Sequence, residues 1–287
     1  MKVTDNPQVS VIIPVWNREL KLSKCLSGVL DQTFDDYEVV VVDSASTDGT
    51  KSVINEFARR SPKVKYVYEP VLGIGRARYR GEIFSKGEVI LMTDSDCEVP
   101  RDWIERMSAP ILGGNFSAVQ GMKHSISRKY WPLNVELEEH RFMRSFFDEN
   151  GSSLVDTANF CIDRKVLEKV GYTDRTVNNL NDADLGARLF DNRYKVALME
   201  TSVGHHYPVS PYKIAKILVI RGSVHYMMRK KYPGNPVFKQ ETIKLFFAYL
   251  LGLASEVFRM KRTFPYNMVS GISWRFGLIW GRMKKPR

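Results

Sequence analysis

The chain has 287 residues, of which 44% are hydrophobic and 26% charged, a balance that indicates a globular protein with one large α/β domain and room for a smaller appendage. Its three cysteines, Cys25, Cys97 and Cys161, are odd in number and far apart, so neither disulfides nor a zinc knuckle is expected, and a reducing compartment fits best. The net charge of +11 lies entirely in residues 205–287, which hold 16 Lys and Arg against two Glu; residues 1–204 carry −3, so nucleic acid is not an expected partner.

The first seven residues contain no apolar stretch, so no secretory signal is expected and the protein is expected in the cytoplasm. Apolar, β-branched runs then alternate with amphipathic stretches, which predicts a mostly parallel sheet covered by helices. In chain order, we expect a strand at 9–15, a helix at 19–31, a strand at 37–43, a helix at 50–60, strands at 64–68 and 88–94, a further strand near 117–122, and a helix at 182–192.

Acidic residues end two of these strands, with Asp43 at the end of one and Asp94 and Asp96 just beyond another. Open α/β sheets bind ligands at the carboxyl ends of their strands, so both sites are expected to face one crevice. Carboxylates two residues apart on extended backbone project to the same side, and together they suit Mg²⁺ or Mn²⁺. Asp43 can accept hydrogen bonds from a base or a ribose, although the turn that follows it can equally cap the next helix.

A segment rich in glycine and arginine covers residues 73–81. Its glycines let backbone approach a ligand closely, and Arg76, Arg78 and Arg80 offer cations to a diphosphate. A dehydrogenase site is improbable, because its glycine-rich turn should follow the first strand, which here ends in Pro14, Val15, Trp16 and Asn17.

Two further positions carry chemistry in the second half of the chain. Asp182 and Asp184 open a predicted helix, where Asp182 can act as a general base or where both can simply favour the positive helix end. His205 and His206 lie in a mixed segment, in which a histidine is more often structural than a ligand.

The last 83 residues are expected to form a basic, aromatic-rich helical extension over 205–287, separate from a domain over 1–204. Its most apolar run, 245–254, is interrupted before it reaches the about 20 residues of a membrane span. Cations interleaved with Trp274 and Trp280 favour an anionic membrane surface, and the alternative is a solvated charged face.

The motifs also occur in a recognisable order. It runs from Val11–Asn17 through Gln32-Thr33-Phe34, Val42–Thr50, the segment 73–81 with Ala77-Arg78, and Asp94-Ser95-Asp96 with Pro100 and Trp103, to Asp182–Leu185 with Arg188. In this order, over roughly residues 9–206, the chain resembles glycosyltransferase family 2.

That resemblance implies a Rossmann-like domain of the GT-A type and an inverting, metal-dependent reaction. It makes Asp182 the catalytic base and Asp43 the residue that holds the nucleotide base. It places Asp96 on the metal, Asp94 near both ribose and metal, and His205 at the metal or diphosphate, with His206 in reserve. The remaining donor-site residues it implies are Pro14, Asn17, Arg76, Arg78 and Ser95.

Some residues depart from the family pattern. Ser44 stands where many members have a second Asp, Tyr79 where Asn is frequent, and Asn181 where an acid usually precedes the base. The Gln-x-x-Arg-Trp signature of processive members is missing after Asp184, so transfer of a single sugar is expected.

The resemblance therefore implies transfer of one sugar from a nucleotide-diphosphate sugar, UDP-sugar favoured, to a hydroxyl of a lipid-linked or membrane-proximal glycan, with Mn²⁺ or Mg²⁺. The expected location is the inner face of the cell membrane, by peripheral association. Two alternatives are a nucleotidyltransferase of similar α/β fold, which would normally carry a glycine-rich, basic loop after its first strand, and a non-catalytic protein that binds lipid or nucleic acid.

Overall fold

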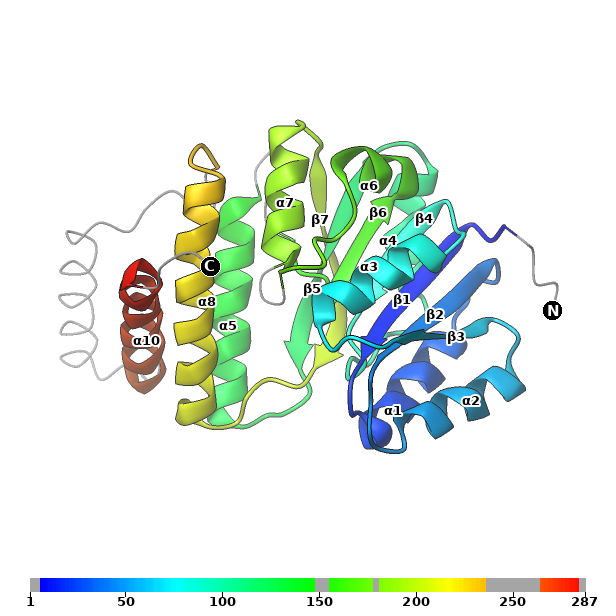
Figure 1. Ribbon diagram of the computed structural model, residues 1–287, viewed down its shortest axis with the longest axis horizontal. Coiled ribbons are helices and arrows are strands. Elements are labelled where there is room, and N and C mark those ends of the chain that lie inside the picture. Colours follow the sequence, from blue (N-terminus) through cyan, green and yellow to red (C-terminus); the bar gives the residue numbers. More distant parts are fainter. Residues whose placement is uncertain (1–5, 148–154, 178–180, 236–263, 284–287) are drawn as a thin grey trace. The chain divides into compact units, whose positions relative to one another are not determined.

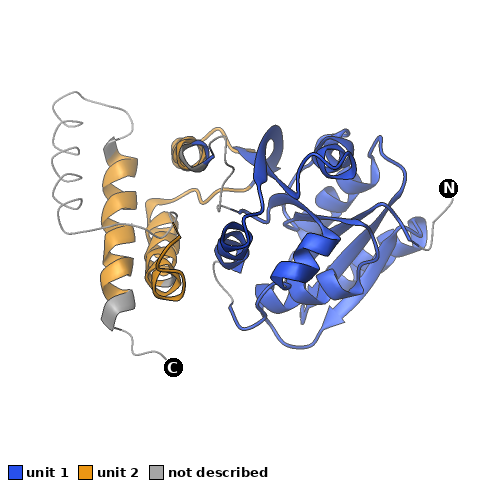
Figure 2. Ribbon diagram, turned by 90° about the horizontal axis from the view of Figure 1, so that it is seen from above, with its two compact units in different colours: residues 1–124, 143–205 blue, residues 125–142, 206–287 orange. Residues whose placement is uncertain are grey.

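The computed structural model describes residues 6–147, 155–177, 181–235 and 264–283, and it divides into two compact units (Figure 2). Unit 1 comprises residues 1–124 and 143–205, and unit 2 comprises residues 125–142 and 206–287. The segment 125–142 thus belongs to the same unit as the basic C-terminal part of the chain.

A seven-stranded sheet forms the centre of unit 1 (Figure 1). Its strands are β1 (Val9–Val15), β2 (Tyr37–Ser44), β3 (Val64–Glu69), β4 (Val89–Thr93), β5 (Ala118–Ser125), β6 (Asn159–Asp163) and β7 (Val196–His205), in the order β3-β2-β1-β4-β6-β5-β7. β3, β2, β1 and β4 are parallel, whereas β6 runs antiparallel to both β4 and β5. The predicted fold class is confirmed.

Helices cover both faces of the sheet because side chains alternate between the faces along each strand. Val11 and Ile13 of β1 pack on one face with α1 (Glu19–Leu30), α2 (Thr50–Arg60) and α4 (Trp103–Leu112). Other buried side chains contact the helices of the opposite face, which are α3 (Ile74–Phe84), α6 (Arg164–Val170) and α7 (Asn181–Asp191). The strands β1, β2 and β4 are buried throughout, as expected for parallel strands with helices on both sides.

Unit 2 is helical and contains most of α5 (Tyr130–Phe146), together with α8 (Pro211–Lys231) and α10 (Phe264–Met283). Its small core joins Val135, Tyr207, Ile214 and Tyr266. α8 and α10 cross at glycines: a Cβ added at Gly222 would collide with the backbone of α10, and one added at Gly277 would collide with the backbone of α8. No helix in the described part of the chain is long and apolar enough to cross a membrane. The apolar run at 245–254 lies outside the described residues.

Candidate active site

The carboxyl ends of β1, β2 and β4 meet at one edge of the sheet. β1 lies between β2 and β4, with Val15 paired to Asp43 and Ile12 paired to Met92. The chain leaves β1 toward β2 on one side and reaches β4 on the other, and such a switch point is where open sheets form a ligand crevice. The expectation that the Asp43 and Asp94 regions share one edge is therefore met in the fold.

The loops after β1 and β2 are hydrogen-bonded to each other at this edge. The Asn17 N–H donates to Ser46 Oγ at 3.0 Å, and Asn17 Oδ1 accepts the Thr47 N–H at 2.8 Å. Asn17 has a left-handed backbone with φ of 49°, which asparagine tolerates better than most residues. Asn17 thus joins the two loops at this edge, while Pro14 lies buried within β1.

Asp43 is 1% exposed, and both of its carboxylate oxygens accept internal hydrogen bonds. Oδ1 accepts the Ser46 N–H at 3.0 Å, and Oδ2 accepts the Tyr66 hydroxyl at 3.2 Å. Burial and the adjacent carboxylate raise the pKa of Tyr66 to about 12, so the phenol keeps its proton and remains a donor. Each oxygen retains a lone pair for a ligand N–H, and the carboxylate has a fixed orientation.

Asp94 and Asp96 lie in a turn, and the extended backbone expected for them is wrong. The Cys97 N–H donates to the Asp94 carbonyl at 3.1 Å, which closes the turn immediately after β4. The two carboxylates accordingly contact cations from different helices. Asp94 Oδ1 accepts from Arg78 Nη2 at 3.2 Å, and Asp96 Oδ2 lies 3.5 Å from Lys21 Nζ.

Most of the glycine-rich segment 73–81 forms the first part of helix α3, with Gly73 at its N-cap, and its glycines approach other parts of the chain. A Cβ at Gly75 would collide with the backbone at Asp174 and Val177, and a Cβ at Gly81 would collide with Ile12, so these glycines permit close packing of the chain on itself. Alternate positions in a helix point in different directions. Arg78 is therefore buried, while Arg76 is half-buried and Arg80 exposed.

Arg78 connects two parts of the site. Its guanidinium donates to Asp94 and, through Nη1, to Asn181 Oδ1 at 2.5 Å. Asn181 is 2% exposed, and its Nδ2 has no hydrogen-bond partner within the described residues. The two hydrogen bonds of Arg78 therefore connect Asp94, after β4, to Asn181, the first residue of α7 and the neighbour of Asp182.

The two acids of α7 have different environments. Asp184 is 1% exposed and pairs with Arg188 Nε at 3.0 Å, and Arg188 also donates to the Val170 carbonyl at 2.9 Å. Asp184 therefore stabilises the packing of α7 on α6. Asp182 is more accessible, and its Oδ1 accepts the Ala183 N–H at 2.8 Å. Of the two, Asp182 is the one that a substrate can reach.

Three side chains in the described residues can approach one metal ion. Ligand atoms of Asp96, Cys97 and His205 all lie within 4.8 Å of one another, and Cys97 Sγ is 3.6 Å from His205 Nδ1. A carboxylate, an imidazole and a thiol are all competent donors to divalent transition metals, so this set fits such an ion. Asp94 stands outside this group, with one oxygen directed at Arg78. His206 is exposed and belongs to unit 2.

An ion pair between a buried lysine and a partly buried aspartate lies beside this cluster. Lys123 Nζ on β5 is 2.6 Å from Asp156 Oδ2. Burial alone would raise the pKa of Asp156, but the Lys123 ammonium holds it well below its usual value. Burial and the same ammonium lower the pKa of His205, so its imidazole is neutral and able to bind a metal at neutral pH.

Several residues of this region could not be recognised as site residues from the sequence. Cys97 was assigned no role, although it is adjacent to Asp96 in the chain. Lys123 and Asp156 come from separate elements, and no local pattern connects them. Ser95, which the family resemblance placed at the donor, is 6% exposed in the same turn as Asp94.

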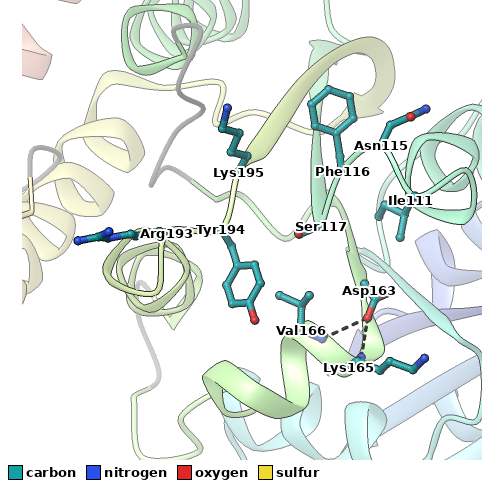
Figure 3. A pocket seen from close by; sticks show the side chains of 11 residues that line it. Ile111, Asn115, Phe116, Ser117, Asp163, Lys165, Val166, Arg193, Tyr194 and Lys195 are labelled. Atoms are coloured by element: carbon teal, nitrogen blue, oxygen red, sulfur yellow. Dashed lines mark hydrogen bonds between the residues drawn. The ribbon is translucent and has the colours of Figure 1, made fainter.

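A separate pocket of about 580 Å³ lies at the opposite edge of the sheet (Figure 3). Asp163 lines it, and Asp163 pairs with Val89 at the start of β4, whereas Asp94 follows the end of that strand. Lys165, Arg193 and Lys195 at its rim are exposed. The pocket is therefore distinct from the acidic edge.

Comparisons with known proteins relate the chain to glycosyltransferases. A family model described as glycosyl transferase family 2 matches residues 10–171. The chain is 28% identical over 217 residues to glycosyltransferase AglE of Haloferax volcanii, a match that covers 72% of this chain and 68% of AglE. It is 31% identical over 158 residues to glycosyltransferase GlyA of Streptococcus pneumoniae, covering 48% of this chain and 23% of GlyA.

Among solved structures, the chain is similar to the mannosyltransferase PcManGT from Pyrobaculum calidifontis in complex with GDP-Man and Mn²⁺. The TM-score is 0.75 at 17% identity, and the match covers 99% of this chain and 89% of the other. At this identity the likeness concerns the fold, and it confirms the GT-A type arrangement.

Proposed function

Because the chain belongs to glycosyl transferase family 2, we propose that it moves a single sugar from a nucleoside-diphosphate sugar to a glycan hydroxyl, with inversion at the anomeric carbon. One observation carries the proposal: Asp43, Asp94 and Asp96 lie at one edge of the sheet, and Arg78 connects Asp94 to the residue before Asp182. Acids at such an edge suit the recognition of a nucleotide, a metal and an acceptor hydroxyl.

In this proposal the donor nucleotide occupies the rim formed by the loops after β1 and β2. Asp43 accepts from the base, beside Pro14 and Asn17, and Asp94 with Ser95 contacts the ribose. Because Arg78 already contacts Asp94, its role is to hold that carboxylate. Arg76, in the first turn of α3, is the cation that faces the diphosphate.

We propose a UDP-sugar as the donor, with GDP-mannose as the alternative suggested by the structural neighbour. Uracil presents one ring N–H, and guanine presents a ring N–H together with an amino group. The remaining lone pairs of Asp43 accommodate either pattern, so the donor has to be identified by experiment.

In the proposed transfer step, different residues of the chain have different roles. Asp182 accepts the proton of the acceptor hydroxyl as that oxygen attacks the anomeric carbon and the nucleoside diphosphate departs. Asp96 and His205 would hold Mn²⁺ or Mg²⁺, and Asp94, two residues before Asp96, would complete the site from the same turn. When bound, the ion neutralises charge that gathers on the leaving diphosphate.

We further propose that unit 2 attaches the enzyme to an anionic membrane surface, next to a lipid-linked or membrane-proximal acceptor. Residues 205–287 carry an excess charge of +14, and each cation near an anionic leaflet is worth about 1 kcal/mol. α10 also has an exposed apolar stripe, because Met268, Ile272, Phe276 and Ile279 follow helical spacing and are between 40% and 57% exposed. Cations together with such a stripe favour an interfacial location.

A panel of nucleotide sugars with Mn²⁺ tests the reaction class and identifies the donor. Release of nucleoside diphosphate from one donor, with a product of opposite anomeric configuration, is the expected result. Release of pyrophosphate from a nucleoside triphosphate and a sugar phosphate would indicate a nucleotidyltransferase. Absence of turnover with every donor, in protein that binds lipid or nucleic acid, would favour a non-catalytic function.

A further inference from the structure

We propose that Cys97 is a ligand in the metal site of Asp96 and His205, so that this site prefers thiophilic ions such as Zn²⁺ and Cd²⁺ to Mn²⁺ and Mg²⁺. The inference rests on the proposed function only in taking this cluster to be the metal site of the enzyme. Its ligand set follows from the positions of these three side chains and goes beyond the oxygen and imidazole ligands expected from the sequence.

The separation of the two softest donors matches one coordination geometry. A tetrahedral ion with a metal–sulfur bond of about 2.3 Å and a metal–nitrogen bond of about 2.0–2.1 Å would hold sulfur and nitrogen about 3.6 Å apart. Cys97 Sγ and His205 Nδ1 are 3.6 Å apart. The pair, which is in direct contact, thus already has the separation that a tetrahedral ion requires.

The local structure directs the Cys97 thiol at this point. The turn that begins at Asp94 places Cys97 immediately after Asp96 and buries its side chain completely. Its other polar neighbours include the Thr93 side chain and the Ala158 carbonyl, which is 4.0 Å from Sγ and accepts the Thr93 hydroxyl at 2.9 Å. His205 Nδ1 lies 3.6 Å from this thiol, and Asp96 is the preceding residue of the chain, so Cys97 faces both other members of the cluster.

The other two cysteines differ from Cys97 and serve as internal controls. Cys25, on α1, donates through Sγ to the Asp94 carbonyl at 3.5 Å, and Cys161 is fully buried within β6. Neither belongs to the set of Asp96, Cys97 and His205. Binding of a metal through a thiolate at this site should therefore depend on Cys97 and not on the other two cysteines.

Hard ions such as Mg²⁺ gain little from a thiolate, whereas Zn²⁺ and Cd²⁺ gain strongly from it. As such an ion binds, the thiol proton passes to solvent and a metal–sulfur bond forms. Zn²⁺ should consequently displace Mn²⁺ from this enzyme at concentrations far below those of Mn²⁺.

Titration of the metal-free, full-length protein with Cd²⁺ tests the inference without any measurement of activity. The wild type should bind one equivalent and develop the ultraviolet absorption of a cadmium–thiolate bond. Cys97→Ser should lose this absorption and bind Cd²⁺ on the order of 100-fold more weakly, with Mn²⁺ affinity changed by only about threefold. Cys25→Ala and Cys161→Ala should behave as the wild type.

A second variant guards against misfolding of Cys97→Ser. His205→Asn should weaken Cd²⁺ binding yet keep the cadmium–thiolate absorption, because it removes only the nitrogen ligand. Absorption that survives in Cys97→Ser, or a wild type that binds Cd²⁺ without it, would overturn the inference. Turnover of a nucleotide sugar by the Mn²⁺ enzyme is measured separately. Loss of turnover with intact cadmium–thiolate absorption would count against the proposed function alone, and turnover without that absorption would count against the thiolate ligand alone.

Discussion

Substitution of Arg78 by methionine tests how strongly the acid after β4 is coupled to α7. Methionine keeps much of the apolar stem and removes the guanidinium that contacts Asp94 and Asn181. The side chain of Asp94 is 29% exposed and can be rehydrated, so its share of the cost is small. Asn181 is 2% exposed, and an acceptor stranded there costs about 1–3 kcal/mol.

Arg78→Met also loses the charge-assisted hydrogen bonds of the guanidinium. When this loss is added to the cost of the stranded acceptor, we expect the free energy of unfolding of unit 1 to fall by about 2–4 kcal/mol. Asn181→Leu in the same background removes the stranded acceptor as well. The double variant should therefore be more stable than the sum of the single effects predicts, with a coupling energy of about 1–2 kcal/mol.

Urea unfolding followed by tryptophan fluorescence measures these energies, because Trp103 is fully buried in unit 1. Arg78→Lys is the matched control: it keeps the charge, cannot reach both partners at once, and should lose less stability than methionine. A cost below about 1 kcal/mol for Arg78→Met, with strictly additive effects of Asn181→Leu, would refute the reasoning.

Three further predictions concern the base, an ion pair and the membrane face. Asp182→Asn should keep donor affinity within a few-fold and lower kcat by about 10²–10⁴, because an amide keeps the size and loses the basicity; isothermal titration and steady-state kinetics measure the two effects. Asp156 has a lowered pKa, so its stabilising effect is complete above its unfolded pKa of about 3.9 and is lost as pH falls toward the folded value. Asp156→Asn should therefore be less stable than wild type in urea at pH 7, and this difference should shrink in acid. Ile272→Asp with Phe276→Asp should weaken binding to anionic liposomes about tenfold, measured by co-sedimentation, since both exposed apolar side chains would enter the interface in the proposed membrane-bound state.

Each of these predictions has its own control. Asp191→Asn, at the exposed end of α7, should leave kcat unchanged, and transfer retained by Asp182→Asn would exclude Asp182 as the base. A stability difference for Asp156→Asn that is constant with pH would contradict the ion-pair account. Leu20→Asp, on an α1 side chain that is 91% exposed, should not affect liposome binding; equal losses in both variants would contradict a membrane face on α10.

Much of the fold followed from the sequence because its strands are buried and its helices amphipathic. The strand at 9–15 was predicted with the bounds that β1 has, since valine and isoleucine dominate this segment, which follows polar residues and ends before a turn. β6, at Asn159–Asp163, was not predicted: it is only five residues long, and it pairs antiparallel to β4, whose partner the pattern could not identify.

The acidic edge could be predicted because the position of Asp43 and Asp94 depends on strand ends alone. The segment 73–81 could not, since a glycine that approaches a ligand and a glycine that packs against its own chain look alike in sequence. The proximity of Cys97 and His205 joins residues 108 positions apart and depends on the tertiary fold. Lys123 and Asp156 likewise meet only because β5 and the loop before β6 fold together.

The most direct test of the account is the dependence of nucleoside-diphosphate release on Mn²⁺ and Asp96. With the donor identified from the panel, the wild type should release nucleoside diphosphate with Mn²⁺ and stop in chelator. Asp96→Ala should lose at least about 100-fold in kcat/KM at any Mn²⁺ concentration, while Glu98→Ala, which removes a surface partner of Lys24 in the same loop, should match the wild type. Full turnover in chelator, with Asp96→Ala unimpaired, would contradict the metal-dependent transfer proposed for this edge of the sheet.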